Sequence, residues 1–127
     1  MSNSVFQIAV DTLSTLNDYS EVLEDLSVKA SELVGQTEFQ DRFLKLIEGI
    51  ETFAESIAQV KTVLHTGHYD NAVVLESDLA SILKELLECQ EKGNLEHERN
   101  LLKVRLPENL TQWRITGLLA IQYSRDC

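Results

Sequence analysis

Residues 37–67, TEFQDRFLKLIEGIETFAESIAQVKTVLHTG, carry the clearest structural pattern in the chain. Apolar side chains recur there every three or four residues, which is the spacing that places side chains on one face of an α-helix. Gly67 is suited to end this helix. Gly49 lies in its middle and indicates that another helix approaches closely, because glycine has no side chain to hold a neighbour away. One long helix with one apolar face predicts a bundle of such helices.

Three further stretches show the same helical spacing of apolar residues. They cover residues 5–34, 69–92 and 94–106. Gly35, Gly67 and Gly93 separate the stretches, as expected for glycines that follow helix ends. Asn94 is a suitable N-cap for the fourth helix, and Asn17-Asp18 falls on the polar side of the first. We therefore predict a single all-α domain over residues 1–127, an antiparallel up-down bundle of four main helices plus a C-terminal helical extension.

The core of this bundle is expected to be built from the apolar stripes of the second and third helices. Its predicted members are Phe39, Phe43, Ile47, Ile50, Phe53, Ile57, Leu75, Leu79, Ile82 and Leu86. At Leu106-Pro107 the fourth helix is expected either to kink or to stop and restart, because proline removes one helical hydrogen bond. The residues beyond have a mixed periodicity, and we interpret them as helix because a single strand would have no partner.

This C-terminal stretch is apolar on more than one side, whereas a surface helix needs only one apolar face. The candidate partner-binding residues are Leu110, Trp113, Ile115, Leu118, Leu119, Ile121 and Tyr123. Tryptophan and tyrosine are frequent anchors of protein interfaces, which favours a partner site. Two alternatives stay open: the stretch lies deep in the core, or it forms the interface of a homodimer.

The charge balance argues against several classes of partner. The chain has 21 acidic and 11 basic side chains, a formal charge of −10. Such a domain is repelled by nucleic acid and by anionic membrane surfaces. Residues 94–127 alone are not acidic, with four acidic against five basic side chains. They are expected either to pack against the acidic body or to form a separate contact surface.

The N-terminal and cysteine patterns predict a cytoplasmic protein. Met1-Ser2-Asn3-Ser4 carries no lysine or arginine, so no secretory signal is expected, and no apolar run is long enough to span a membrane. Cys89 and Cys127 are then expected to be free thiols. Cys89 lies beside Leu86 on helical spacing and is expected to be a small core residue rather than a nucleophile paired with His97.

Residue patterns typical of catalytic, metal or cofactor sites are incomplete in this sequence. His65, His68 and Asp70 are close in sequence, but Gly67 breaks the helix between the histidines and no cysteine is near, so no metal site is expected. None of the three histidines has a glutamate three residues before it, which argues against a di-iron bundle. No nucleotide-binding glycine motif occurs. We expect no enzyme activity, no metal and no cofactor.

A row of carboxylates accompanies the apolar stripe of the second helix. Glu48, Glu51 and Glu55 recur every three or four residues along one flank. Paired carboxylates perform acid–base chemistry when one of them is buried and its pKa is raised. Here they border the apolar stripe with Lys45 in reach of Glu48, so a solvated helix face is the expected interpretation.

Two stretches resemble segments of small uncharacterised bacterial helical proteins, over about half of the chain. The first is residues 46–53, LIEGIETF, and the second joins Gly93-Asn94 to Leu101-Leu102, Leu106-Pro107, Leu110 and Trp113. The chain departs from their pattern in having Lys103 and Arg105 where acidic residues accompany the Leu-Pro pair. This resemblance implies a helical bundle and no particular activity.

In size, acidity and helicity the chain is also similar to the cytoplasmic export chaperones of flagellar and type III secretion systems. The flagellar members are helical bundles that bind a helix of their partner along an apolar groove. The sequence as a whole therefore predicts a non-catalytic protein-interaction module, an adaptor or a chaperone-like bundle. A structural homodimer and, less favoured, a metal- or ligand-binding enzyme built on the bundle are the alternatives.

Overall fold

The computed structural model describes residues 2–64 and 72–126. Its helices are α1 (Ser2–Glu32), α2 (Phe39–Leu64), α3 (Ala72–Lys92), α4 (Leu95–Asn100) and α5 (Leu106–Asp126), with a π-helical turn over Leu101–Arg105 between the last two. Within those two ranges there is no β-strand, so the prediction of an all-α bundle is confirmed. The predicted C-terminal extension is the second half of one helical rod that starts at Leu95.

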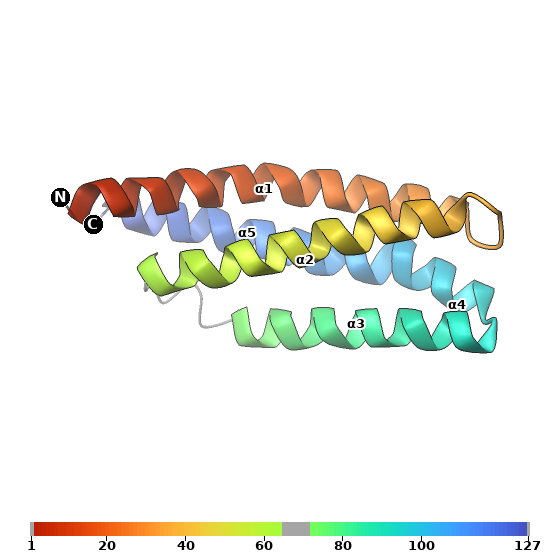
Figure 1. The fold of residues 1–127 in the computed structure, drawn as a ribbon. Coiled ribbons are helices and arrows are strands. Elements are labelled where there is room, and N and C mark those ends of the chain that lie inside the picture. Colours follow the sequence, from red (N-terminus) through yellow and green to blue (C-terminus); the bar gives the residue numbers. More distant parts are fainter. Residues whose placement is uncertain (1, 65–71, 127) are drawn as a thin grey trace.

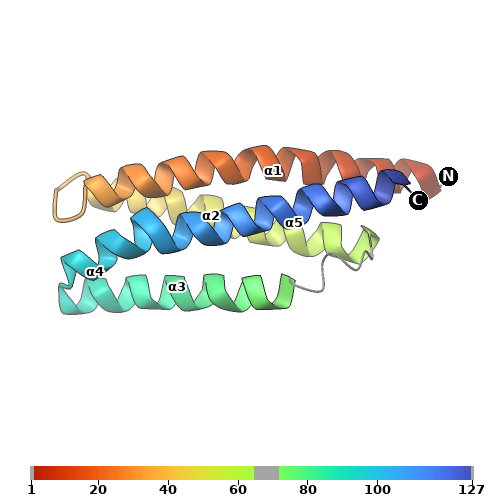
Figure 2. The same ribbon diagram turned by 180° about the vertical axis from the view of Figure 1, so that it is seen from behind.

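The helices alternate in direction, and both chain ends lie at the same end of the bundle (Figures 1 and 2). α1 packs along both α2 and α5, and α3 packs along α5. The backbones of α2 and α3, although consecutive in sequence, approach each other at few points. Among the four neighbouring helix pairs of the bundle, the backbones of α2 and α3 therefore approach each other least, and we call this side of the bundle the open edge.

The apolar face of α1 packs against α2 around Gly49. A Cβ atom added to Gly49 would lie 2.7 Å from both Leu23 Cδ2 and Tyr19 Oη, which is closer than real side chains permit. The expectation that Gly49 admits a neighbouring helix is thus confirmed, and the neighbour is α1. Eight of the ten predicted core residues are buried, while Ile47 and Leu75 are partly buried at the edge of the core.

Small polar side chains of α1 are buried as well, and those of Asn17 and Ser27 contact the last helical rod. The buried set is Asn17, Ser20, Ser27 and Ser31. The prediction that Asn17 lies on the polar, solvent side was wrong. Its side chain fills the space left by the missing side chain of Gly117 on α5. Small side chains on both helices let their backbones come close, and the sequence pattern alone did not reveal this contact.

The chain stays helical through Pro107, so neither the predicted kink nor the predicted stop describes it fully. Leu106 donates its backbone N–H to the carbonyl of Leu101, five residues earlier, which widens the helix to a π turn. Pro107 has no N–H, so it cannot donate the hydrogen bond that a helical residue makes to a carbonyl four or five residues earlier. The buried hydroxyl of Ser27 donates to such a carbonyl, that of Leu102, at 2.5 Å. A side chain of α1 thereby completes the hydrogen bonding of the last helix.

Two of the three glycines predicted to follow helix ends, Gly35 and Gly93, do so in the structure, and Gly67 lies outside the described residues. Gly35 and Gly93 both have positive φ, +87° and +69°, a conformation that residues with a Cβ adopt only with strain. Asn94 caps α4 by accepting a hydrogen bond from the backbone N–H of His97 at 3.3 Å. The Asn94 cap predicted from the sequence is confirmed.

Two basic residues of the last rod pair with acids of the other helices. Arg114 on α5 donates to Glu24 on α1 at 2.6 Å. Arg105 in the π turn forms ion pairs with Asp78 and Glu85 of α3 at 3.3 and 3.4 Å. Of the two alternatives for residues 94–127, these contacts support packing against the acidic body.

Candidate functional site

The open edge of the bundle forms a groove, which we call the α2–α3 groove. Its volume is about 360 Å³. It is lined by Ile50, Glu51, Phe53, Ala54, Ile57 and Ala58 from α2, by Glu76, Leu79, Ala80 and Leu83 from α3, and by Trp113 from α5. The lining is predominantly apolar, as in sites that receive an apolar side of a partner or ligand.

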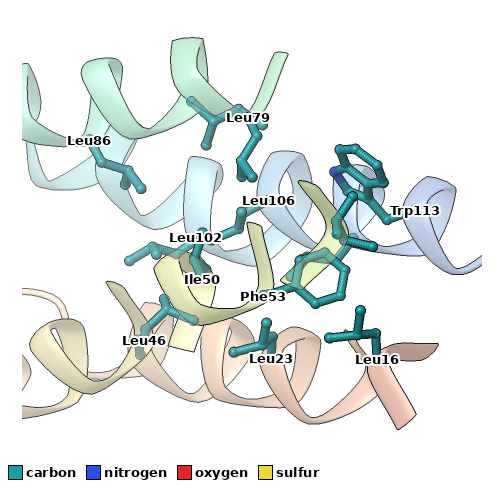
Figure 3. Packing of buried hydrophobic residues seen from close by; sticks show 14 of the residues in the cluster. Leu16, Leu23, Leu46, Ile50, Phe53, Leu79, Leu86, Leu102, Leu106 and Trp113 are labelled. Atoms are coloured by element: carbon teal, nitrogen blue, oxygen red, sulfur yellow. The ribbon is translucent and has the colours of Figure 1, made fainter. Parts of the chain in front are cut away.

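Trp113 belongs to α5 but reaches this groove between the other two helices (Figure 3). Its ring meets Phe53 of α2 edge to face, with the ring centres 6.2 Å apart and the planes at 81°. This arrangement is favourable for aromatic rings and holds the indole in place. In Figure 3 the indole nitrogen lies on the side of the ring nearer to Leu79 of α3.

The indole N–H of Trp113 lacks a hydrogen-bond acceptor. Trp113 is 97% buried, and its Nε1 finds no partner within the described part of the chain. A buried N–H group without an acceptor costs about 1–3 kcal/mol, and most such groups in proteins are paired. The indole N–H is therefore a buried donor without an acceptor in the described structure.

Small side chains border the groove on both helices. Ala54, Ala58 and Ala80 are all exposed, and they lie beside the buried Ile57 and Leu79. Larger residues at these positions would close the gap between the helices. Leu87 follows Leu83 by one turn and is 56% exposed, so it continues the apolar face of α3 beyond the groove.

Two glutamates lie among the residues that line the groove. Among the described lining residues Glu51 and Glu76 are acidic and none is basic. Glu48 and Glu55 lie one turn to either side of Glu51 and are exposed. The solvated face predicted for these three glutamates of α2 is confirmed, and Glu51 is in addition part of the groove.

The predicted partner-binding residues of the C-terminal stretch are divided by the structure. Leu110, Trp113 and Ile121 are buried in the core. Ile115, Leu118 and Leu119 are 44%, 54% and 46% exposed and form an apolar strip on the outer side of α5. Tyr123 lies on α5, and its side chain falls outside the described residues. Among the members of this set whose side chains the structure describes, only Trp113 lines the groove.

Sequence reasoning missed the groove residues other than Trp113. The helical stripes of α2 and α3 were interpreted as core, and the groove arises because α3 turns toward α5 instead of closing on α2. One signal was available in the sequence. Ala54 and Ala58 broaden the stripe of α2 on one side, and a broad stripe with small residues at its edge indicates apolar surface beyond the core.

Cys89 and His97, the cysteine and histidine considered together in the sequence, lie at one small cavity of about 110 Å³. Burial and the charges of Glu98, Glu85 and Glu88 raise the pKa of the Cys89 thiol, which opposes formation of the nucleophilic thiolate. Across residues 2–64 and 72–126 no cluster of three metal-binding side chains occurs, and His65, His68 and Asp70 lie outside these residues.

Glu98 on α4 is a buried carboxylate near Cys89. It is 3% exposed, and its Oε2 completes no hydrogen bond in the described structure. Burial raises the pKa of the Glu98 carboxyl. The nearby Gln90 amide, which falls short of good hydrogen-bond geometry, offsets only part of this rise. Ionised Glu98 is therefore a destabilising element of the fold near neutral pH.

The Glu98→Gln variant is expected to be more stable than the wild type near pH 7, by about 1 kcal/mol, because it removes a buried charge. A raised pKa in the folded state contributes stability below the unfolded pKa, and this contribution is lost as the pH rises through the folded value. The advantage of the variant should accordingly shrink toward about pH 4. Urea unfolding at both pH values measures it, and the exposed Glu96→Gln is the matched control. An equal advantage at both pH values would contradict the assignment.

The described helices contain no segment long and apolar enough to cross a lipid bilayer. Comparison of the chain with protein-family models, with curated proteins and with solved structures finds no match. The groove itself is therefore the feature that bears on function.

Proposed function

We propose that the protein is a non-catalytic interaction module, an adaptor or chaperone-like bundle, that holds an apolar helix face of a partner protein in the α2–α3 groove. The observation that carries this proposal is the open edge itself, an apolar groove between two helices with Trp113 at its floor. Binding of an amphipathic helix in a groove between helices is a common mode of peptide recognition. A buried tryptophan surrounded by apolar residues is also typical of the residues that dominate binding energy.

The dimensions of the groove agree with a helical occupant. From Ile50 to Ala58 the lining of α2 extends about 12 Å, or about two turns of helix. The corresponding residues of α3, from Glu76 to Leu83, extend over a similar length. Two turns of a partner helix present two or three apolar side chains at positions i, i+3 and i+4, which suits a groove of this length.

The test blocks the groove without disturbing the core. Ala80 lines the groove and is exposed, whereas Ser81 is its exposed neighbour, rotated away from the groove by about 100°. The wild type, Ala80→Arg and Ser81→Arg are each used to capture proteins from the native host, with quantification by mass spectrometry. We expect a partner retained by the wild type and Ser81→Arg and reduced at least about tenfold by Ala80→Arg.

Both arginine variants introduce the same charge on the same helix, so a difference in capture between them reports the effect of the position alone. Far-ultraviolet circular dichroism establishes that both are folded. An identical set of captured proteins for all three chains would contradict a binding role for the groove.

A homodimer is the second candidate, and the exposed strip of Ile115, Leu118 and Leu119 on α5 favours it. Apolar strips of this kind are frequently covered by a second copy of the same chain. Sedimentation equilibrium over a range of concentrations distinguishes this candidate, because a dimer through α5 would form in Ala80→Arg as readily as in the wild type.

A further inference from the structure

We infer that the first half of α3, residues 72–81, is a movable wall of the α2–α3 groove, which a polar latch holds against the last helical rod. The latch consists of Arg105 and Asn109 on the rod and Asp78 on α3. The opening of this wall stands on the structure alone, and only its use in admitting a partner rests on the proposed function. Three features carry the inference: the burial along α3, the cavities beside it and the contacts of the latch.

The two halves of α3 are buried to different extents. In residues 73–81 only Leu79 is buried. In residues 82–92 three side chains are buried: Ile82, Leu86 and Cys89. A segment with few buried apolar contacts separates from a fold more readily than the segments around it. The first half of α3 is therefore the more weakly attached one.

Cavities border the first half of α3 on two sides. The α2–α3 groove, about 360 Å³, lies toward α2, and this half contributes Glu76, Leu79 and Ala80 to its lining. A second cavity of about 390 Å³ lies toward the rod and is lined by Leu75, Asp78, Arg105, Glu108, Asn109 and Gln112. Side chains that border a cavity make fewer van der Waals contacts than side chains in a filled core. This half of the helix is therefore incompletely packed on both sides.

The latch supplies polar contacts where apolar packing is incomplete. Arg105 donates to Asp78 at 3.3 Å and also to Glu85, in the second half of α3, at 3.4 Å. Asn109 donates through Nδ2 to the other carboxylate oxygen of Asp78 at 3.0 Å and to the Leu75 carbonyl at 3.1 Å. Asp78 is thus the acceptor that both latch residues of the rod share.

The latch is partly open to water, so it holds α3 without fixing it permanently. The side chains of Arg105 and Asp78 are 39% and 43% exposed, and ion pairs at such positions add little to stability. Asn109 is only 2% exposed, so its two hydrogen bonds are the stronger part of the latch. Glu76 has an interaction partner as well, so the latch is not the whole attachment of this segment. Its loss is therefore expected to make opening more frequent rather than to detach α3.

Opening of this segment would widen the groove. Leu79 and Ala80 form its α3 side and face the lining of α2, which includes Ala54 and Ile57. Elements that move when a protein binds a ligand are drawn from the least stable parts of its fold. The first half of α3 meets this condition, and its movement would give a partner helix access to the apolar residues below.

Hydrogen exchange of single backbone amides, followed by NMR on the full chain, measures the opening. In the wild type the amides of residues 77–81 are expected to exchange at least about tenfold faster than those of residues 86–90, relative to their intrinsic rates. The comparison starts at residue 77 because the first four N–H groups of any helix have no helical acceptor. Equal protection of the two segments would overturn the inference.

The Asp78→Ala variant distinguishes a latch from the ordinary fraying of a helix end, because it removes the shared acceptor. The amides of residues 77–81 should exchange about fivefold faster in this variant, while those of residues 46–57 in α2 keep their wild-type rates. Ser77→Ala, at the exposed neighbouring position, is the matched control and should cause no increase. Alanine favours the helix at both positions, so faster exchange in Asp78→Ala alone would come from the lost contacts.

The outcomes separate this inference from the proposed function. Unchanged exchange in Asp78→Ala, or an increase spread evenly over all helices, would overturn the latch. The exchange experiment contains no partner, so either result would leave the capture experiment with Ala80→Arg as an independent test of the groove. Failure of that capture experiment would in turn contradict the binding role and leave the measured opening of α3 in place.

Discussion

The Ile50→Asp variant is expected to lose the folded bundle. Ile50 is 1% exposed at the centre of α2, among the buried residues that join α2 to the rest of the core. An unpaired charge at such a position costs about 3–5 kcal/mol. The total stability of a domain of this size is about 5–15 kcal/mol, so one substitution removes a large part of it. Thermal unfolding followed by far-ultraviolet circular dichroism measures the loss.

Leu44→Asp is the matched control for this experiment. Leu44 lies on the same helix and is 56% exposed, so its aspartate remains in water. We expect this variant to change stability by less than about 1 kcal/mol. An unfolding transition of Ile50→Asp as high as that of the wild type would contradict the placement of Ile50 in the core.

The Ser27→Ala variant is expected to destabilise the protein by about 1–3 kcal/mol, a large effect for the loss of one hydroxyl. Ser27 is fully buried and donates to the Leu102 carbonyl in the π turn. Without the hydroxyl the Leu102 carbonyl has no hydrogen-bond donor, because Pro107 has no N–H and α1 no longer supplies one. Urea unfolding of the variant and the wild type measures the difference.

A double-mutant cycle with Pro107→Ala tests this reason directly. Alanine at position 107 restores a backbone N–H that reaches back to the carbonyls of the preceding turn. In the Pro107→Ala background the cost of Ser27→Ala should therefore fall to less than about half. An equal cost in both backgrounds would mean that the Ser27 hydroxyl stabilises the fold independently of Pro107.

The helices themselves were predictable because their signals are local. The stripe through Phe43, Ile50 and Ile57 repeats at helical spacing whatever lies beside it. Gly93 and Asn94 end one helix and cap the next through contacts within a few residues. The C-terminal stretch was harder to assign, because a helix with buried residues on several sides loses its simple periodicity.

The candidate site was predictable only through Trp113. The sequence drew attention to this residue as an interface anchor, but it placed the site on the exposed side of α5. The groove depends on Ala54 from α2 and Ala80 from α3, which are distant in sequence. Alanine in a helix carries no signal of its own, because it is favourable in every helical position. Ala54 and Ala80 matter here because their small side chains leave a gap between the two helices.

The sequence by itself determined that the chain forms long amphipathic helices and that the protein is acidic. It also determined most of the helix boundaries, because spacing, capping and charge are properties of neighbouring residues. Only the tertiary structure decided which helix faces meet. It paired Asn17 with Gly117 and Ser27 with the Leu102 carbonyl, and it left α2 and α3 apart over Trp113. These contacts depend on the fit between surfaces far apart in the chain, where small polar and apolar residues gain their role from the partner they face.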